Sequence, residues 1–231
     1  MKISKQEVTL VDHMGSDLSI VNAARVSFHK ESEYTVGTYP NETTTTKHLK
    51  DGDIKLINYL AKHNHWTPFA HTSLTFRIKA PIFVARQLGK HQVGLVWNEV
   101  SRRYVDDEPE FYLPDTFRGK ADSVKQGSGK EPIADSNKWL RYAAAHNEEC
   151  LSLYNDALDE GMCPEQARMF LPQNMMTEWI WTGSLAAFAR VCHLRLDPHT
   201  QLETQEIATL LARCLERTFP VGYTALGSTN A

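Results

Sequence analysis

The chain has 231 residues, of which 42% are hydrophobic, and this is enough apolar material for one sizeable core or two small ones. With 25 basic and 28 acidic side chains the formal net charge is -3, which argues against a protein that binds nucleic acid through a broad basic face. No apolar run approaches the length of a membrane span, and residues 1–7 lack the apolar core of a signal peptide. We therefore expect a single domain over residues 1–231 that is soluble and cytoplasmic, with neither a nucleic-acid nor a membrane partner.

Strand and helix patterns begin close to the amino terminus. Residues 8–13 alternate apolar and polar side chains as a strand does, and Ser16 with Asp17 predicts the cap of a following helix. Residues 29–50 are polar and rich in threonine, which predicts a surface excursion. Helical spacing resumes over residues 54–61.

The clearest period of two covers residues 73–80, where Leu74, Phe76 and Ile78 share one face. This pattern predicts a half-buried strand. Pro81 suits the first turn of a helix that continues to Leu88, since its missing N–H costs nothing there. The polar segment that follows is expected to run from this helix into a loop.

The second half of the chain is predicted to be mainly helical. The expected elements are a polar excursion near 106–136, a long helix over about 137–160, a short helix from Pro164 that contains Arg168, a strand at 175–182, a helix capped by Ser184, and a final helix over 199–217 that Pro220 ends.

Two neighbouring segments, residues 86–92 and 98–104, concentrate the polar chemistry of the chain. Their cations suit a bidentate grip on a phosphate, although a solvated charged face explains such a cluster equally well. Amide, carboxylate and hydroxyl groups lie between the cations and would serve the edge of a pyrimidine, which favours a nucleotide site. The residues are Arg86, Gln87, Lys90, Asn98, Glu99, Ser101, Arg102 and Arg103.

His63, His65 and His71 form a pattern compatible with zinc. No fourth ligand lies nearby in the sequence, so we expect no metal and favour histidines that form hydrogen bonds or contact a cofactor.

The sequence offers no convincing cysteine or serine nucleophile. Cys192 and His193 are adjacent, and adjacent residues on a helix point about 100° apart, so Cys192 is expected in the core. Ser101 lacks the glycine elbow of a serine nucleophile and is more plausible as a ligand-binding hydroxyl. The four cysteines are widely spaced, and we expect them to be reduced and buried.

The tryptophans divide into two expected groups. Trp179 and Trp181 are two apart in an apolar strand and are expected in the core. Trp66 and Trp97 adjoin the polar segments and could line a pocket for a flat ring.

Five sequence blocks in order resemble those of the flavin-dependent thymidylate synthases. They are residues 22–28 (Asn-Ala-Ala-Arg-Val-Ser-Phe), 63–71 (His-Asn-His-Trp-Thr-Pro-Phe-Ala-His) with its continuation to Gln87, 98–104 (Asn-Glu-Val-Ser-Arg-Arg-Tyr), Ala167-Arg168 with Leu171-Pro172, and Leu194-Arg195 with Asp197 and His199. The resemblance implies an α+β fold with a small mixed or antiparallel sheet and several long helices. It further implies a homotetramer with active sites where subunits meet.

The reaction that this resemblance implies is the methylation of dUMP to dTMP. FAD would be the cofactor, 5,10-methylenetetrahydrofolate the carbon donor and NADPH the reductant. A related flavin enzyme that acts on a pyrimidine nucleotide with another carbon donor is an alternative. A binder of single-stranded nucleic acid that uses Arg102, Arg103 and Tyr104 is a second alternative, which the net charge disfavours.

The resemblance also assigns roles by position. Arg195 would help to ionise the uracil ring, and His65 would assist folate or hydride chemistry near the flavin. The residues implied to bind dUMP are Gln87, Lys90, Glu99, Val100, Ser101, Arg102, Arg103 and Arg168. Those implied to contact FAD are Ser27, Thr67, Lys90, His91, Gln92, Glu99, Ser184 and Arg190.

The chain departs from the family signature in one block. The family has Arg-His-Arg, then seven residues and a serine, whereas this chain has Lys90-His91-Gln92, then eight residues before Ser101. Lys90 keeps a cation without the planar fork of arginine, and Gln92 carries no charge. Flavin or phosphate binding at this block is therefore expected to depend on other groups.

Overall fold

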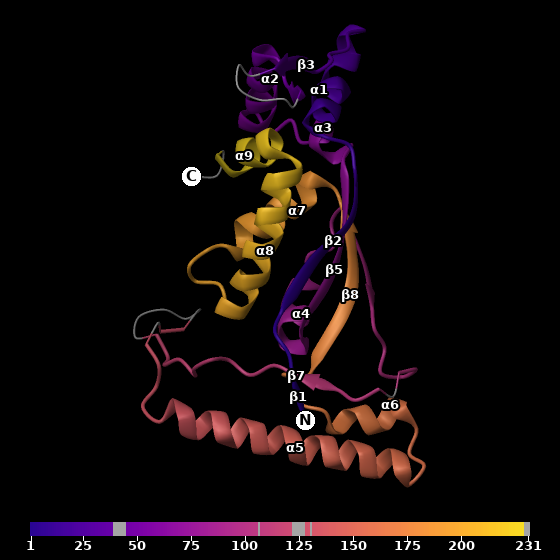
Figure 1. The fold of residues 1–231 in the computed structure, drawn as a ribbon, viewed down its shortest axis with the longest axis vertical. Coiled ribbons are helices and arrows are strands. Elements are labelled where there is room, and N and C mark those ends of the chain that lie inside the picture. Colours follow the sequence, from indigo (N-terminus) through magenta and orange to yellow (C-terminus); the bar gives the residue numbers. More distant parts are fainter. Residues whose placement is uncertain (39–44, 106, 122–127, 130, 229–231) are drawn as a thin grey trace.

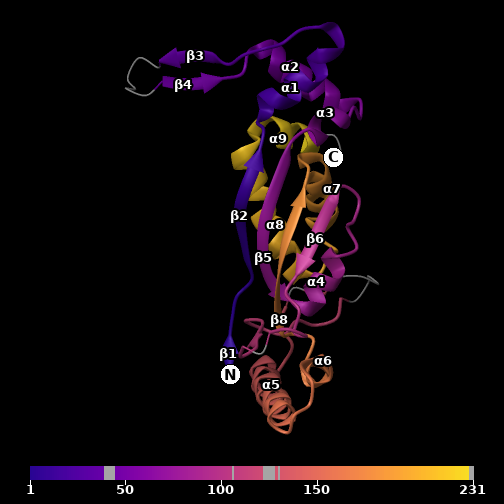
Figure 2. The same cartoon turned by 90° about the vertical axis from the view of Figure 1, so that its right-hand side faces the viewer.

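An antiparallel sheet forms the centre of the computed structural model, which describes residues 1–38, 45–105, 107–121, 128–129 and 131–228. Its strands are β2 (Glu7–Met14), β5 (Ser73–Pro81), β8 (Met176–Gly183) and β6 (Leu95–Glu99), hydrogen-bonded in that order. Figure 2 shows them side by side, with helices behind them. The register pairs Phe76 with Trp181, and Trp97 pairs with the same tryptophan from the other side.

Three helices cover one face of this sheet: α4 (Ile82–Leu88), α7 (Leu185–Arg195) and α8 (Leu202–Thr218), as Figure 1 shows. Alternate residues of β5 and β8 point toward them and are fully or almost fully buried. The Phe188 ring of α7 lies edge-on to Phe76 and Trp181, at centroid distances of 4.9 and 5.3 Å. The main hydrophobic core therefore lies between the sheet and these helices.

At one end of the sheet lie α1 (Asp17–Arg25), the 3-10 helix η1 (Val26–Phe28), α2 (Asp51–Lys62), α3 (Thr67–Ala70) and α9 (Pro220–Ser228). The buried Asp17 carboxylate joins two of these helices, because it accepts hydrogen bonds from the backbone N–H groups of Val221 and Gly222 at 2.9 and 2.8 Å. A hairpin of β3 (Thr35–Thr38) and β4 (Thr45–His48) projects from this end.

The other end of the molecule has a second, smaller core. The long helix α5 (Ser136–Asp159) lies across the direction of the strands and packs against α6 (Pro164–Ala167) and the 3-10 helix η2 (Arg168–Phe170). The two short strands β1 (Lys2–Ile3) and β7 (Glu110–Phe111) pair in parallel nearby. Phe111, Tyr154 and Met175 are buried in this second core.

The α+β architecture, the long helix and the strand at 73–80 are confirmed, as is the cap of α7 by Ser184. Three expectations need correction. The stretch 29–50 is a surface excursion but contains the β3–β4 hairpin, with residues 39–44 outside the described part. Residues 95–99, expected in a loop, form β6, and Pro220 begins α9 rather than only ending α8.

The polar stretch, the cysteines and the tryptophans can also be compared with what the sequence predicts. The described residues near 106–136 contain only strand β7 as regular structure before α5, while residues 106, 122–127 and 130 lie outside them. Trp179, Trp181, Cys150 and Cys192 are buried as expected, but Cys214 is only partly buried and Cys163 is exposed because it precedes α6 at the surface. Within the described residues, no helix has both the length and the apolar character that a membrane crossing requires.

Candidate functional site

The loop formed by residues 89–94 joins α4 to β6 and runs alongside α7. Near its end Gly94 has a positive φ of 74°, and a side chain there would meet Ala187 of α7. One step back, the Val93 carbonyl accepts a 2.6 Å hydrogen bond from Arg190. Further back again, His91 contacts Arg195. This loop, which carries the altered signature, is therefore held along the length of α7.

A cavity of about 430 Å³ opens beside this loop, and we call it the loop cavity. It is lined by Arg86, Lys90, His91, Gln92, Trp97 and Glu99, among others. No carboxylate of the described residues lies within salt-bridge distance of Arg86 or Lys90. Their charges are thus available to an anionic ligand.

Glu99 forms the wall between this cavity and a second one. Its Oε1 accepts a 2.7 Å hydrogen bond from the Thr177 hydroxyl, and its Oε2 accepts one at 3.1 Å from the Trp97 indole. The Trp97 ring in turn stacks on Trp179, with centroids 4.2 Å apart. Both carboxylate oxygens are therefore held by neighbours that the core fixes in place.

The second cavity, which we call the arginine cavity, also measures about 430 Å³. Arg102 and Arg168 line it together with Glu99 and Val100. Arg102 is mostly buried and donates to the Asp107 carbonyl, with the Asp107 carboxylate 3.5 Å away. Arg168 is exposed, and its Nε donates to the Glu165 carbonyl at 3.2 Å.

A third cavity of about 300 Å³, the histidine cavity, lies on another face of α7. His65 and Trp66 line it from the turn after α2, and Arg190 and His193 line it from α7. Arg190 also holds the loop through Val93, so it connects this cavity to the loop. The loop cavity and the arginine cavity thus adjoin at Glu99, whereas the histidine cavity lies along α7 and shares no lining residue with them.

Arg195 is positioned by His91. The guanidinium Nε donates to His91 Nε2 at 2.9 Å, which requires a neutral imidazole with its proton on Nδ1. Neither Nη group of Arg195 has a hydrogen-bond partner among the described residues. Burial lowers the pKa of Arg195 from its ordinary value without removing its charge at neutral pH, because guanidinium groups titrate far above pH 7.

Burial lowers the pKa of His91 from its ordinary 6.5, and the charges of Arg195 and Arg190 lower it further. Because the folded pKa is the lower one, the stabilisation from neutral His91 is complete above pH 6.5 and is lost as the pH falls through the folded value. We expect an NMR titration of the His91 ring to give a midpoint below 6.5 that rises in Arg195→Ala. A wild-type midpoint at or above 6.5 would contradict the described contact.

Arg195 and several other predicted residues are not among those that line these three cavities. Gln87 points to α8, where its carbonyl oxygen accepts from the Thr204 hydroxyl. The Ser101 hydroxyl accepts from Arg103 Nε at 3.2 Å, and Arg103 itself lies over the Tyr104 ring. Ser27 on η1 and Thr67 on α3 are exposed near one end of the sheet. Ser184 caps α7 by accepting from the Ala187 N–H at 3.2 Å.

Two partners of the site were not singled out in the sequence. Thr177 holds Glu99 and Thr204 holds Gln87. Thr177 stands on the buried face of β8, and a hydroxyl among inward apolar residues is the signal that could have indicated a polar partner. Thr204 offers no comparable signal, because its partner is 117 positions away in the chain.

The three histidines of the zinc-like pattern do not form a metal centre. The rings of His63 and His65 have centroids 6.5 Å apart, and Tyr59 packs against both. Across the described part of the chain, no group of three or more His, Cys, Asp or Glu side chains is arranged to hold a metal ion.

Comparisons with known proteins show which protein family this chain belongs to. The family model described as "Thymidylate synthase complementing protein" matches residues 9–221. A flavin-dependent thymidylate synthase of Thermus thermophilus is 36% identical over 96% of this chain and 76% of its own length, and that of Thermosipho africanus is 35% identical over 94% and 89%.

Among solved structures, the UMP/dUMP methylase PolB of Streptomyces cacaoi, bound with 5-Br dUMP, matches with a TM-score of 0.84 and 28% identity. The match covers 100% of this chain and 98% of PolB. These findings identify the protein as a methyltransferase. The chain belongs to the flavin-dependent thymidylate synthase family, which confirms the resemblance carried by the five sequence blocks.

Proposed function

We propose that this protein catalyses the reductive methylation of dUMP to dTMP in the cytoplasm, with residues 1–231 acting as a single domain. FAD would be the cofactor, 5,10-methylenetetrahydrofolate the carbon donor and NADPH the reductant. The observation that supports this most is a pair of adjoining cavities that share Glu99 and are lined by cations without an ionic partner among the described residues, Arg86, Lys90 and Arg168, together with an Arg195 guanidinium whose Nη groups are free among the same residues. Family membership supports the same reaction.

In this proposal the arginine cavity and its neighbours bind dUMP. Arg102 and Arg168 supply cations for the phosphate, while Glu99 and the Val100 backbone supply groups for the polar edge of the base. Lys90, on the adjoining wall, adds charge. Ser101 and Arg103, which form a hydrogen-bonded pair, are also proposed to bind dUMP. Gln87 is proposed to bind it too, because Gln87 lies on α4, the helix that lines part of the loop cavity.

The loop cavity fits a flavin nucleotide, because unpaired cations suit a diphosphate and Trp97 gives a flat apolar wall. Lys90, His91, Gln92 and Glu99 would hold the group there, with Ser184 and Arg190 from α7. When bound, the flavin would supply the reducing equivalents that complete the transferred methyl group.

Arg195 would act on the substrate base. A guanidinium beside the pyrimidine carbonyl stabilises the negative charge that develops on the ring, so the ring carbon becomes nucleophilic without a covalent enzyme adduct. His91 fixes the side chain through Nε and leaves the two Nη groups to donate. His65, which lines the histidine cavity, is proposed to assist the folate or hydride chemistry there.

The active assembly is proposed to be a homotetramer with shared sites. Ser27 on η1 and Thr67 on α3 line neither the loop cavity nor the arginine cavity, which fits a site where a second protomer brings them to the flavin. Ile180 and Val96 are exposed on the sheet face that the helices leave uncovered. Exposed apolar groups on such a face favour subunit contact.

The direct test is the absorbance of the purified protein. We expect a flavin spectrum that bleaches with NADPH and recovers when dUMP and 5,10-methylenetetrahydrofolate are added, with dTMP as product. Recovery only with another carbon donor would support the related enzyme instead. Steep salt-dependent binding to single strands without any flavin would support the nucleic-acid binder.

A second substrate should be assayed beside dUMP, because the solved PolB structures are titled as a UMP/dUMP methylase and one holds 5-Br UMP. Product analysis with UMP in place of dUMP tests whether the 2′-hydroxyl is accepted.

The variant Lys90→Arg is expected to keep flavin and dUMP binding within about threefold of wild type. Arginine restores the planar fork of the family signature at a residue that has no ionic partner among the described residues. Flavin absorbance after gel filtration and a dUMP titration measure the two affinities. Loss of both would show that the loop of residues 89–94 is shaped differently from that of the family.

A further inference from the structure

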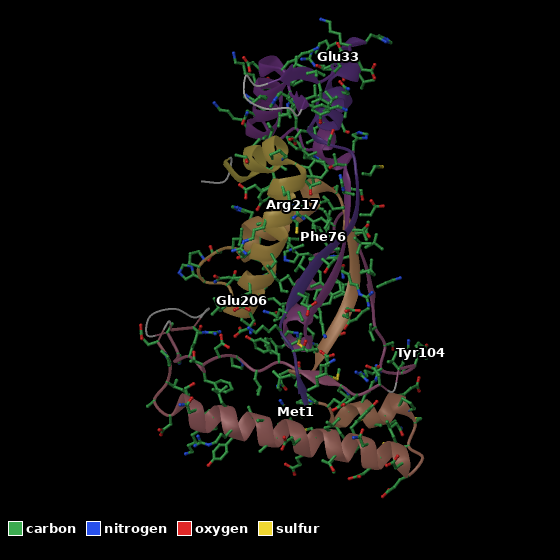
Figure 3. All side chains as sticks on the ribbon, viewed as in Figure 1. Met1, Glu33, Phe76, Tyr104, Glu206 and Arg217 are labelled. Atoms are coloured by element: carbon green, nitrogen blue, oxygen red, sulfur yellow. The ribbon has the colours of Figure 1, made fainter. Side chains whose placement is uncertain are left out.

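Glu99 lies where β6 leaves the core for the surface. Trp97, two residues earlier, stacks on Trp179 in the core, and Figure 3 shows Phe76 among the core side chains and Tyr104 at the outer margin of the molecule. Glu99 is exposed and lines both the loop cavity and the arginine cavity. No ion pair among the described residues includes it. A long side chain in such a position would sample several rotamers unless its neighbours held it.

The register of the sheet brings a hydroxyl within reach of this carboxylate. Glu99 pairs directly with Trp179 of β8, so Thr177, two residues away on the same face of β8, is its diagonal neighbour. Diagonal neighbours in a sheet are about 7–8 Å apart, a span that a glutamate side chain can cross. The Thr177 hydroxyl donates to Glu99 Oε1 at 2.7 Å, which is the only hydrogen bond of this hydroxyl among the described residues.

The two groups that hold Glu99 line different cavities. Thr177 lines the arginine cavity, whereas Trp97, whose indole donates to Oε2, lines the loop cavity. Thr177 is only 8% exposed, so a strand of the central sheet fixes its position before any ligand arrives. Both donors are neutral, and a carboxylate offers about four acceptor sites. Glu99 therefore keeps its charge, and it keeps acceptor sites for the N–H or O–H groups of a ligand.

We propose that Thr177 is a positioning residue for the nucleotide: by holding Oε1, it fixes the Glu99 carboxylate at the wall of the arginine cavity, where it accepts a hydrogen bond from the substrate. This inference rests on the proposed function, in which Glu99 binds dUMP. Thr177 acts through Glu99 and not by touching the substrate. A carboxylate already held in its bound orientation loses less conformational entropy on binding, so Thr177 should raise the affinity for dUMP and not the rate of the chemical step.

The test compares two variants that each remove one hydroxyl from β8. Thr177→Val keeps the branched shape and should weaken dUMP binding about tenfold, the cost of losing one hydrogen bond to a charged group. Thr177→Ser keeps the donor and should stay within about threefold of wild type. Thr182→Val is the matched control, because the Thr182 hydroxyl contacts that of Thr75 at 3.0 Å on the opposite face of β8. It should bind dUMP as wild type does.

Affinity is measured by calorimetric titration of the flavin-loaded protein with dUMP, in excess FAD and without reductant, so that no turnover occurs. Steady-state kinetics of Thr177→Val should show a KM for dUMP about tenfold higher and a kcat within about twofold of wild type. Circular dichroism and urea unfolding show whether the variants are folded and equally stable. Thr177→Ala removes the same donor with a smaller side chain, and it keeps the proposal testable if valine disturbs folding.

A second background shows whether Thr177 acts through Glu99. Glu99→Ala should itself weaken dUMP binding, and Thr177→Val added to it should change the affinity by less than about twofold. Unchanged affinity in Glu99→Ala or in a folded Thr177→Val would overturn the inference, as would an equal loss in Thr182→Val or a full tenfold further loss in the Glu99→Ala background.

Failure of the proposed function would look different. Absence of dUMP binding by the wild-type protein would overturn the proposed function and this inference together. Absence of dTMP formation by a protein that binds dUMP would overturn only the proposed function.

Discussion

Replacement of Arg195 by alanine is expected to lower dTMP formation by at least 10²- to 10³-fold, roughly the cost of removing one donor that stabilises a transition-state charge. The protein should stay folded and yellow. Arg195 ends α7, and the only hydrogen bond that its side chain makes among the described residues is the one to His91, so the loss of the guanidinium breaks no core contact. The rate of dTMP formation and the flavin absorbance after gel filtration are the two measurements.

Arg195→Lys is the matched control for this prediction. Lysine keeps the positive charge but lacks both the Nε that donates to His91 and the pair of Nη groups. It should therefore recover only a small part of the lost rate. Turnover at the wild-type rate in Arg195→Ala would exclude the proposed role.

The second large effect is expected from Gly183→Ala, at the end of β8. A Cβ at this position would lie 2.5 Å from Leu95 Cδ2 and 2.6 Å from the Gly94 carbonyl oxygen. Because one neighbour is backbone, β6 would have to move away from β8 and take Glu99 with it. We expect the free energy of unfolding to fall by about 3 kcal/mol or more and dUMP binding to weaken, as urea unfolding and a dUMP titration would show.

Gly52→Ala is the control, because nothing lies within 4 Å of a Cβ at that helical position. Alanine there should be neutral or stabilise the protein by up to about 1 kcal/mol. If Gly183→Ala behaved like Gly52→Ala, the close contact between β8 and the loop would be wrong.

Periodicity predicted the elements that one apolar face defines. Residues 73–80 alternate strictly, and the helix over 136–159 has both its spacing and its end signals, so both were predictable. Strand β6 was not, because its inward positions are Leu95, Trp97 and Glu99. A carboxylate on the inward face breaks the apolar pattern at the position where the site needs it.

Two other elements depend on contacts that local sequence does not show. Thr35, Val36, Lys47 and His48 of the β3–β4 hairpin are exposed, so the side chains described for these strands form no buried face to mark them. Helix α9 begins at Pro220, and the Asp17 carboxylate accepts the N–H group of Val221, which lies 204 positions further along the chain. Only the folded chain brings that cap to the helix.

The candidate site was predictable as a set of residues but not as an arrangement. The sequence blocks indicated Lys90, His91, Glu99 and Arg195 as one group, and the structure places them around α7 and β6. It could not indicate that Arg195 would be held by His91, since the two are 104 positions apart. Nor could it indicate that Gln87 would turn toward α8.

Glu99 stands in the wall shared by the loop cavity and the arginine cavity, with each carboxylate oxygen already held by a neighbour. A molecule in either cavity that shifts this carboxylate changes the surface offered to the other. Thermodynamic linkage then requires the effect to be reciprocal, so that the nucleotide and the flavin proposed for these cavities would alter one another's affinity by the same factor. Glu99 alone would make the two binding equilibria interdependent, so the affinity measured for one ligand would depend on whether the other ligand is bound.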